Sequence, residues 1–114
     1  VDIVALAHAI GIKRVKVVDP YNLKETRDTI HEELAVDEPS LIISRRPCVL
    51  LKTFKGAPAY EIKDCKKCKM CMKIGCPAIS FNENGAVIDN TLCVGCGVCE
   101  QLCKFDALKS GKEA

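Results

Sequence analysis

The sequence predicts an α+β protein made of two parts, and three observations lead to this prediction. Residues 1–51 alternate between helix-like and strand-like hydrophobic patterns, as α/β folds do. Residues 60–114 contain eight of the nine cysteines, gathered in two dense runs that are typical of a metal-binding module. Residues 52–59 contain Gly56 and Pro58 and are expected to form a linker between the two parts, with a short strand following at Tyr60–Ile62.

The first part is expected to run helix, strand, helix, strand. Asp2 can cap a short, almost wholly apolar helix that stops at Gly11, and such a helix is expected to be buried. The β-branched run at 15–18 predicts a strand, and Asn22 can cap the amphipathic helix that follows. The apolar run at 41–44 predicts a second strand, parallel to the first. Two parallel strands alone do not make a stable sheet, so this part is expected to belong to a larger α/β domain.

Composition narrows the function classes. The 17 basic and 15 acidic residues almost balance, so the net charge indicates no nucleic-acid partner. No apolar run approaches the length of a membrane span and no cleavable leader pattern precedes residue 10, so we expect a soluble cytoplasmic protein that does not contact a membrane. A chain that starts at Val1 without a methionine is expected to be a piece of a longer protein.

The two cysteine runs read as copies of one unit. A shift of 28 residues, from 65 to 93, superimposes the first three cysteines of the two runs, which are Cys65, Cys68 and Cys71 on Cys93, Cys96 and Cys99. The fourth cysteines, Cys76 and Cys103, depart from this register by one residue, and Gly75 is the expected insertion. Between the runs, Asn84 and Gly85 predict a tight turn.

Four cysteines in each run allow three kinds of chemistry. Disulfide frameworks spread their cysteines along the chain to link distant segments, and these runs do not. Zinc is usually held by two separated C-x2-C pairs and does not need a third cysteine at the same interval. Three cysteines at this interval can instead wrap three corners of a cubane cluster from one loop. The spacing resembles that of bacterial-type ferredoxins, which implies two 4Fe-4S clusters, with a structural zinc module and disulfides as the alternatives.

The pattern C-x2-C-x2-C, followed by a fourth cysteine and a proline, resembles the bacterial-type ferredoxin signature, in which the fourth cysteine binds the other cluster. The resemblance implies that one cluster is held by Cys65, Cys68, Cys71 and Cys103, and the other by Cys93, Cys96, Cys99 and Cys76. Each fourth cysteine is expected to begin a helix that carries it toward the partner cluster. Lys104 stands where proline is usual, which removes a helix-starting constraint but no ligand.

Nearly the whole chain resembles the C-terminal end of the alpha subunit of indolepyruvate ferredoxin oxidoreductase. The resemblance is carried by "VKVVDPYNLKETRDTIHEEL", "PSLIISRRPCVLL" and "CKKCKMCMKIGCPAI". It implies that residues 1–51 are the last elements of a thiamine-diphosphate-binding α/β domain. It also implies that residues 60–114 form a ferredoxin-like, two-cluster domain that relays electrons from the oxidative decarboxylation of an aryl 2-oxoacid.

The same resemblance implies partners and cofactors. A beta subunit completes the oxidoreductase, and ferredoxin accepts the electrons. The family's Gly-Asp-Gly motif for magnesium and diphosphate does not occur in this sequence, so thiamine diphosphate and magnesium are expected only in the full-length subunit. No catalytic residue is expected here. The alternative is an independent ferredoxin-like carrier in which the first fifty residues are an appendage.

The remaining candidates are weaker. Lys66, Lys67 and Lys69 have three open interpretations: they raise the potential of the first cluster, dock an acidic ferredoxin, or form a solvated loop. Cys48 is expected to be a buried small hydrophobe, and Arg46 with its neighbour Arg45 to form a structural salt bridge. Surface or packing roles are expected for His8 and His31, and Met70 and Met72 are expected to pack around the cluster or the core without binding iron.

Overall fold

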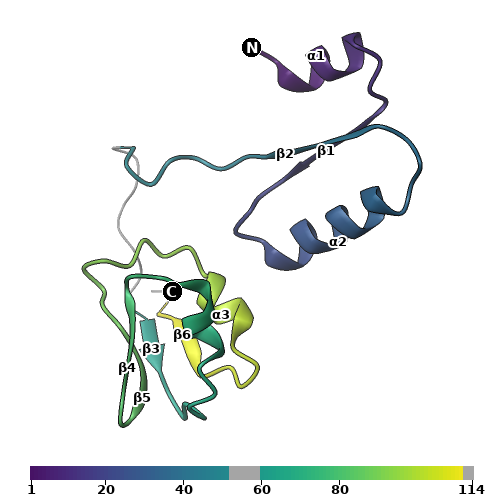
Figure 1. The fold of residues 1–114 in the computed structure, drawn as a ribbon. Coiled ribbons are helices and arrows are strands. Elements are labelled where there is room, and N and C mark those ends of the chain that lie inside the picture. Colours follow the sequence, from purple (N-terminus) through teal and green to yellow (C-terminus); the bar gives the residue numbers. More distant parts are fainter. Residues whose placement is uncertain (52–59, 112–114) are drawn as a thin grey trace. The chain divides into compact units, whose positions relative to one another are not determined.

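A computed structural model describes residues 1–51 and 60–111, and the chain divides into two compact units, Val1–Cys48 and Val49–Ala114 (Figure 1). The linker expected at 52–59 lies outside the described residues. The domain boundaries expected from the sequence, at 51–52 and 59–60, stay a prediction. None of the helices in the described part of the chain has the length and apolar character that crossing a membrane requires.

Both helices of the first unit begin at the predicted capping residues. Helix α1 spans Ile3–Ala9, and the Asp2 carboxylate accepts a backbone N–H of its first turn at 3.0 Å. Helix α2 spans Leu23–Leu34, and the Asn22 side-chain oxygen accepts the Glu25 N–H at 3.2 Å. The Asn22 amide also donates to the Glu25 carboxylate at 2.9 Å. The side chain just before each helix therefore accepts a hydrogen bond from one of the backbone donors that a helix start leaves unpaired.

The two strands of the first unit pair in parallel, as predicted. Strand β1 spans Arg14–Val18 and strand β2 spans Ser40–Ser44, with α2 connecting them. The register pairs Arg14 with Ser40 and Val18 with Ser44. Each strand begins one residue earlier than the apolar runs indicated. The order helix, strand, helix, strand is confirmed.

The expected burial of the apolar helix α1 is wrong. The side chains of Ile3, Leu6 and Ile10 are 47%, 53% and 69% exposed, and Ala7 is the one residue of α1 that is buried. A sheet of two strands offers too little surface to cover an apolar helix on more than one side. The first unit therefore leaves apolar surface uncovered within the described residues.

One buried charge in the first unit could not be read from the sequence pattern. Glu33 is 4% exposed, and the Arg14 guanidinium donates to both of its carboxylate oxygens at 2.8 and 2.9 Å. The Arg14 hydrogen bond lowers the pKa of Glu33. The pair ties the end of α2 to β1.

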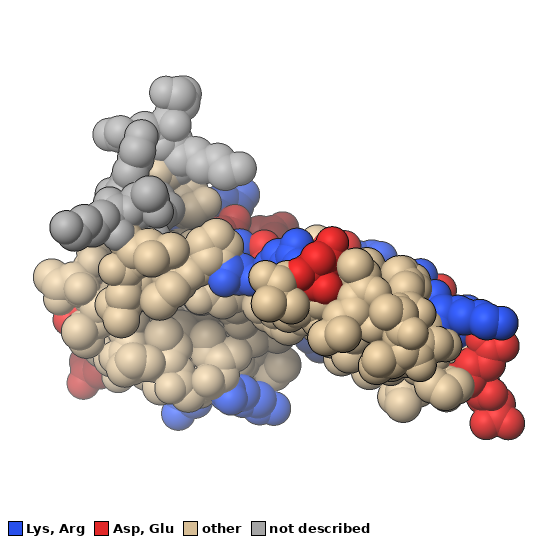
Figure 2. All heavy atoms as spheres, turned by 90° about the horizontal axis from the view of Figure 1, so that it is seen from above, with Lys and Arg blue, Asp and Glu red and all other residues tan. Residues whose placement is uncertain are grey.

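In the view of Figure 2, basic and acidic side chains lie interspersed on a surface that consists mostly of uncharged residues.

The second unit contains two antiparallel strand pairs. Strand β3, Tyr60–Ile62, which the sequence predicted, pairs with the last strand, β6, Leu108–Ser110. Strands β4, Ile79–Asn82, and β5, Gly85–Ile88, form a hairpin (Figure 1). The first and last strands of the unit are thus neighbours, while the middle two pair locally. The predicted turn is present, but residues 83–84 form it, one position earlier than the Asn-Gly signal indicated.

A short helix follows the cysteine loop in each half of the repeat. The 3-10 helix η1 spans Met70–Ile74, and helix α3 spans Val98–Leu102, which is again a shift of 28 residues. The third cysteine of each run lies within the helix, and the fourth follows its C-terminal end. The expectation that the fourth cysteine begins a helix is therefore wrong. Gly75, with φ of +65°, ends η1 in the left-handed conformation and supplies the residue that the second half lacks.

The core of the second unit is built partly from cysteine. Its buried residues are Cys71, Ile79, Ala86, Cys99 and Leu108. No large side chain is fully buried anywhere in the described residues. A unit of this size with so small an apolar core needs an additional source of stability, which a disulfide or a metal can supply.

Candidate metal centres

The two cysteine loops follow the same backbone path. In the first loop, Lys67 and Lys69 adopt left-handed conformations with φ of +54° and +59°. Twenty-eight residues later, Gly95 and Gly97 adopt φ of +69° and +73°. In both loops, one left-handed residue thus separates the first cysteine from the second, and another separates the second from the third.

The thiol of Cys65 lies against the backbone of the hairpin. Gly85 has φ of +125°, and a β-carbon at this glycine would lie 2.8 Å from the Cys65 sulfur. This approach lets the Ala86 N–H, together with the Lys67 N–H, bond to the Cys65 sulfur and lower the pKa of that thiol. Only glycine fits at position 85, because both the conformation and the space exclude a side chain.

Two other cysteines accept backbone hydrogen bonds in the same way. The Gly95 N–H donates to the Cys93 sulfur at 3.4 Å, and the Ala107 N–H donates to the Cys103 sulfur at 3.4 Å. Backbone donors to sulfur stabilise thiolates and lower the electron density that they give to a bound metal. Backbone N–H groups are therefore directed at the sulfurs of Cys65, Cys93 and Cys103.

Four cysteines line each of two cavities. The first cavity is lined by three cysteines of the first run and one of the second, namely Cys65, Cys68, Cys71 and Cys103. The second cavity is lined by three cysteines of the second run and one of the first, namely Cys93, Cys96, Cys99 and Cys76. The helix that follows each loop delivers the fourth cysteine to the cavity of the other run.

The walls of the two cavities differ. Lys66, Lys69, Phe81 and Phe105 line the first, and its Cys68 is exposed. The second cavity, with a volume of about 150 Å³, has no basic residue in its lining. Its walls are Tyr60, Pro77, Gly97 and aliphatic side chains. The first site therefore has basic side chains in its wall, and the second has none.

Burial opposes ionisation of the third cysteine in each loop. Desolvation raises the pKa of Cys71, and it raises the pKa of Cys99 to about 11. Burial also raises the pKa of Tyr60, whose side chain packs beside Cys99 and the second loop, to about 12. Buried thiols of this kind become thiolates when a metal replaces their protons, so metal binding here is expected to release protons.

The donor chemistry fits 4Fe-4S clusters. All nine cysteines are free thiols. Within residues 1–51 and 60–111, no three His, Cys, Asp or Glu side chains converge closely enough to bind one metal ion. In a 4Fe-4S cluster each thiolate binds a different iron, so four thiols spread around a cavity are the arrangement that such a cluster needs.

The structure also shows the surroundings of the weaker candidates from the sequence. Cys48 is exposed, so the expectation of a buried residue is wrong; it follows β2 in irregular chain with no layer over it. Arg46 forms the expected salt bridge, with Asp19, and its guanidinium lies 4.1 Å from the centre of the Tyr21 ring. The His8 ring contacts a backbone carbonyl of its own loop at 3.0 Å. Met70 lines the first cavity, whereas Met72 is exposed.

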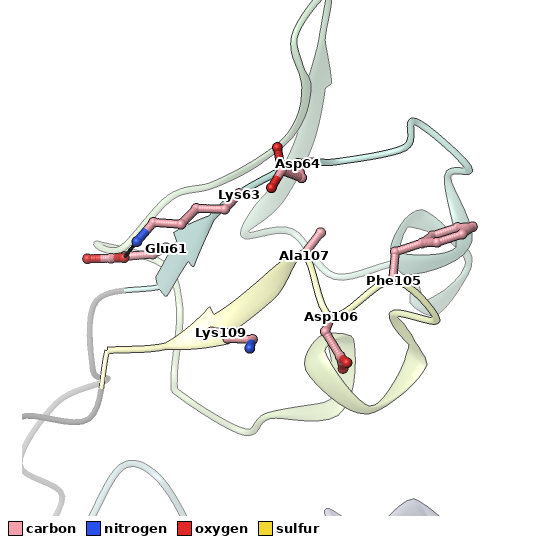
Figure 3. Close-up of a pocket in the computed structure, with 7 residues that line it drawn as sticks. All are labelled: Glu61, Lys63, Asp64, Phe105, Asp106, Ala107 and Lys109. Carbon is pink, nitrogen blue, oxygen red and sulfur yellow. Dashed lines mark ion pairs between the residues drawn. The ribbon is translucent and has the colours of Figure 1, made fainter.

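A third hollow, which sequence reasoning missed, adjoins the first cavity. Its volume is about 430 Å³, and it is lined by Glu61, Lys63, Asp64, Phe105, Asp106, Ala107 and Lys109 (Figure 3). Phe105 and Ala107 line both this hollow and the first cavity. Glu61 and Lys63 form an ion pair at 2.9 Å, and the Phe105 ring points away from them. No spacing in the sequence indicated that β3 and β6 would meet here.

Comparisons with known proteins agree with this geometry. Residues 86–109 match a family described as the 4Fe-4S binding domain. The chain is 38% identical to the indolepyruvate oxidoreductase subunit IorA of Pyrococcus abyssi and 40% identical to that of Thermococcus kodakarensis, in each case over 95% of this chain and 18% of the relative. This chain is similar to IorA along nearly its whole length. The resemblance that the sequence indicated is confirmed.

The chain spans less than a fifth of the length of these IorA relatives, 18%. It is also 42% identical to Ferredoxin-1 of Caulobacter vibrioides, over 47% of this chain and 51% of that protein. No solved structure matches the chain. The 4Fe-4S chemistry is thus supported by a family match and by relatives of two kinds.

Proposed function

We propose that the chain relays electrons through two 4Fe-4S clusters as a part of a 2-oxoacid oxidoreductase subunit. One cluster is bound by Cys65, Cys68, Cys71 and Cys103, and the other by Cys93, Cys96, Cys99 and Cys76. The observation that carries this proposal is that each cavity combines three cysteines of one run with the fourth of the other. Because each half of the repeat supplies its fourth cysteine to the cluster of the other half, both clusters link the two halves.

The residues of this chain bind and tune the clusters. A 4Fe-4S cluster, when bound, takes up and releases one electron at a time. The backbone N–H groups that bond to Cys65, Cys93 and Cys103 stabilise negative charge on sulfur. The buried Cys71 and Cys99 shield their sides of the sites from water. Tuning of this kind needs no acid, base or nucleophile.

A second part of the proposal concerns the full-length subunit to which this chain would belong. We propose that the first unit is the end of a thiamine-diphosphate-binding domain, with thiamine diphosphate and magnesium bound elsewhere in the full-length subunit. The uncovered apolar side chains of α1 and the two-stranded parallel sheet support this, because both need further layers. The relatives carry the name indolepyruvate oxidoreductase. We therefore propose indolepyruvate or another aryl 2-oxoacid as electron source, a beta subunit as partner, ferredoxin as acceptor, and the cytoplasm as location.

An independent electron carrier is the second candidate. The similarity to Ferredoxin-1 is confined to about half of the chain, and it favours a unit that can bind its clusters alone. The two functions differ in what reduces the clusters. Under the first, a 2-oxoacid reduces them in the full-length subunit supplied with thiamine diphosphate, magnesium and its beta subunit. Under the second, a 2-oxoacid leaves them oxidised while dithionite reduces them.

The test of the metal centres comes first. Iron, acid-labile sulfide and zinc are measured per chain on protein prepared without oxygen, and electron paramagnetic resonance spectra are recorded after dithionite reduction. We expect about eight irons and eight sulfides, with signals from two interacting reduced clusters. One or two zinc ions without sulfide or signal, in protein reconstituted with iron and sulfide, would mean a structural zinc module and would overturn the proposal.

A further inference from the structure

The charges around the two cavities are distributed unequally. Between Cys65 and Cys76 the sequence has four lysines and no acidic residue, and between Cys93 and Cys103 its one charged residue is Glu100. Three of the four lysines, Lys66, Lys67 and Lys69, lie in the first loop and are exposed; they are called the loop lysines below. The positive charge of the second unit is thus concentrated at one of its two candidate centres.

The loop lysines are not used to bind carboxylates of this chain. Within the described residues no ion pair involves them, whereas Lys16, Lys24 and Lys63 lie 3.2, 2.7 and 2.9 Å from carboxylates. One of the loop lysines contacts an aromatic ring: the Lys69 ammonium lies 5.3 Å from the centre of Phe81. The positive charges of the loop are therefore available to a partner.

Two of the loop lysines occupy backbone positions that suit glycine. Lys67 and Lys69 are left-handed, and the residues at the same positions in the second loop are Gly95 and Gly97. A left-handed conformation is disfavoured for lysine because its β-carbon crowds the carbonyl oxygen. Residues kept in such conformations are concentrated at functional sites. Lysine is thus kept in a strained conformation beside the first candidate centre, at positions where the second loop has glycine.

An aromatic side chain lies beside this charge. Phe105 is 52% exposed and lines the first cavity together with Lys66 and Lys69. Its ring points away from the ion pair in the neighbouring hollow (Figure 3). An exposed aromatic residue with basic residues around it is the composition of a protein interface, in which the ring supplies contact area and the charges supply orientation.

We propose that the loop lysines and Phe105 form the docking surface for an acidic one-electron carrier protein, which exchanges electrons at the first cavity. This inference rests on the proposed function. Each productive encounter moves one electron from the reduced chain to one oxidised carrier, with no proton or bond transferred. Opposite charges steer such encounters and make their rate fall with salt. Exposed Cys68 marks the side of the site that a carrier can approach.

The test measures the rate at which the dithionite-reduced, cluster-loaded chain reduces an acidic ferredoxin, used as the probe, in stopped flow at low and high salt. The variant K66Q/K67Q/K69Q removes the three charges of the loop lysines. The matched control, K13Q/R27Q/R45Q, removes three exposed charges of the first unit. We expect the loop variant to react about tenfold more slowly at low salt, with the difference lost at high salt, and the control to stay within about twofold of wild type.

A second variant separates charge from backbone. K67G/K69G gives the first loop the residues of the second loop at its left-handed positions. We expect this variant to retain its iron and sulfide and to lose its visible colour at the same or a higher temperature than wild type, yet to reduce ferredoxin more slowly. Wild-type rates in this variant would overturn the proposal, because the lysines would then contribute nothing that glycine cannot.

Four further outcomes are decisive. Equal loss of rate in the loop variant and the control would overturn the proposal, since net charge alone would then explain the effect. A shifted midpoint potential with an unchanged salt dependence would overturn it in favour of potential tuning by the same lysines. If the wild-type chain holds its clusters and reduces a small uncharged dye, but its reaction with ferredoxin does not depend on salt, the docking proposal is overturned and the proposed function stands. If it holds no cluster, the proposed function fails.

Discussion

The two cysteine loops share a backbone path and differ in almost everything placed on it. Both have left-handed residues at the same two positions, which are Lys67 and Lys69 in the first loop and Gly95 and Gly97 in the second. Both also direct a backbone N–H to the sulfur of their first cysteine. The backbone features that position the cysteines are thus repeated, whereas the side chains between the cysteines differ.

The variable side chains give the two sites different surroundings. The first cavity has lysines, and the second cysteine of its loop, Cys68, is exposed; the second cavity has Tyr60, and the corresponding Cys96 is half-buried. Basic side chains beside an exposed ligand suit an encounter with an acidic protein, and the second site offers no such charge. The difference teaches that a duplicated loop can keep its backbone path while the charge around one copy diverges.

The largest expected effect comes from exchanging the fourth ligands. Cys103→Ala is expected to remove the cluster of the first loop, and Cys76→Ala that of the second, because each fourth cysteine lies at the cavity of the other run. Iron should fall from about eight to about four per chain in either variant. Iodoacetamide labelling with mass spectrometry identifies the released cysteines. Labelling of Cys93 in the Cys103→Ala chain would contradict the crossed arrangement.

Thiol reactivity in the metal-free chain is expected to differ between the loops. Hydrogen bonds lower the pKa of Cys65, and burial raises the pKa of Cys99 to about 11, so near pH 8 a larger fraction of Cys65 is thiolate. We expect Cys65 to be alkylated about tenfold faster, after allowance for the lower nucleophilicity of a more acidic thiol. The difference should shrink as the pH approaches 11. Alkylation in denaturant is the control, and equal rates in the folded chain would contradict the assignment.

Gly85→Ala is expected to destabilise the first site. A β-carbon there meets the Cys65 sulfur at 2.8 Å, and φ of +125° disfavours any side chain. Steric overlap and backbone strain together should cost about 3 kcal/mol. Gly75→Ala is the matched control, since φ is +65° and nothing lies within 4 Å of its β-carbon position, and it should cost about 1 kcal/mol. The temperature at which cluster absorbance is lost compares them; equal losses would refute the close approach.

The smallest expected effect concerns the left-handed positions themselves. Gly95→Lys gives the second loop the residue that the first loop has at the same position, and should lower stability by about 1 kcal/mol through backbone strain. The reciprocal Lys67→Gly should raise it by less, because glycine also gains freedom in the unfolded chain. Thermal loss of cluster absorbance measures both. A stabilised Gly95→Lys chain would show that the two loops do not share this constraint.

Local features of the fold were predictable from particular residues. Asp2 and Asn22 locate the helix starts because a cap acts on donors only two or three residues away. Strand β3 was predicted from its own apolar residues, but its partner β6 was not, since nothing in a three-residue strand specifies which distant strand it meets. The buried pair of Arg14 and Glu33 was missed for the same reason.

The features of the candidate site also fall into two groups, those that residue order determines and those that the tertiary structure determines. The 28-residue repeat, the eight cysteines and the IorA resemblance are properties of residue order, so the sequence by itself determined the chemistry expected here. Burial of Cys99 and the contact between Gly85 and Cys65 depend on segments far apart in the chain, as does the exposure of α1. Only the tertiary structure decided these, because burial and close approach are set by what other elements cover, and residue order does not state which elements those are.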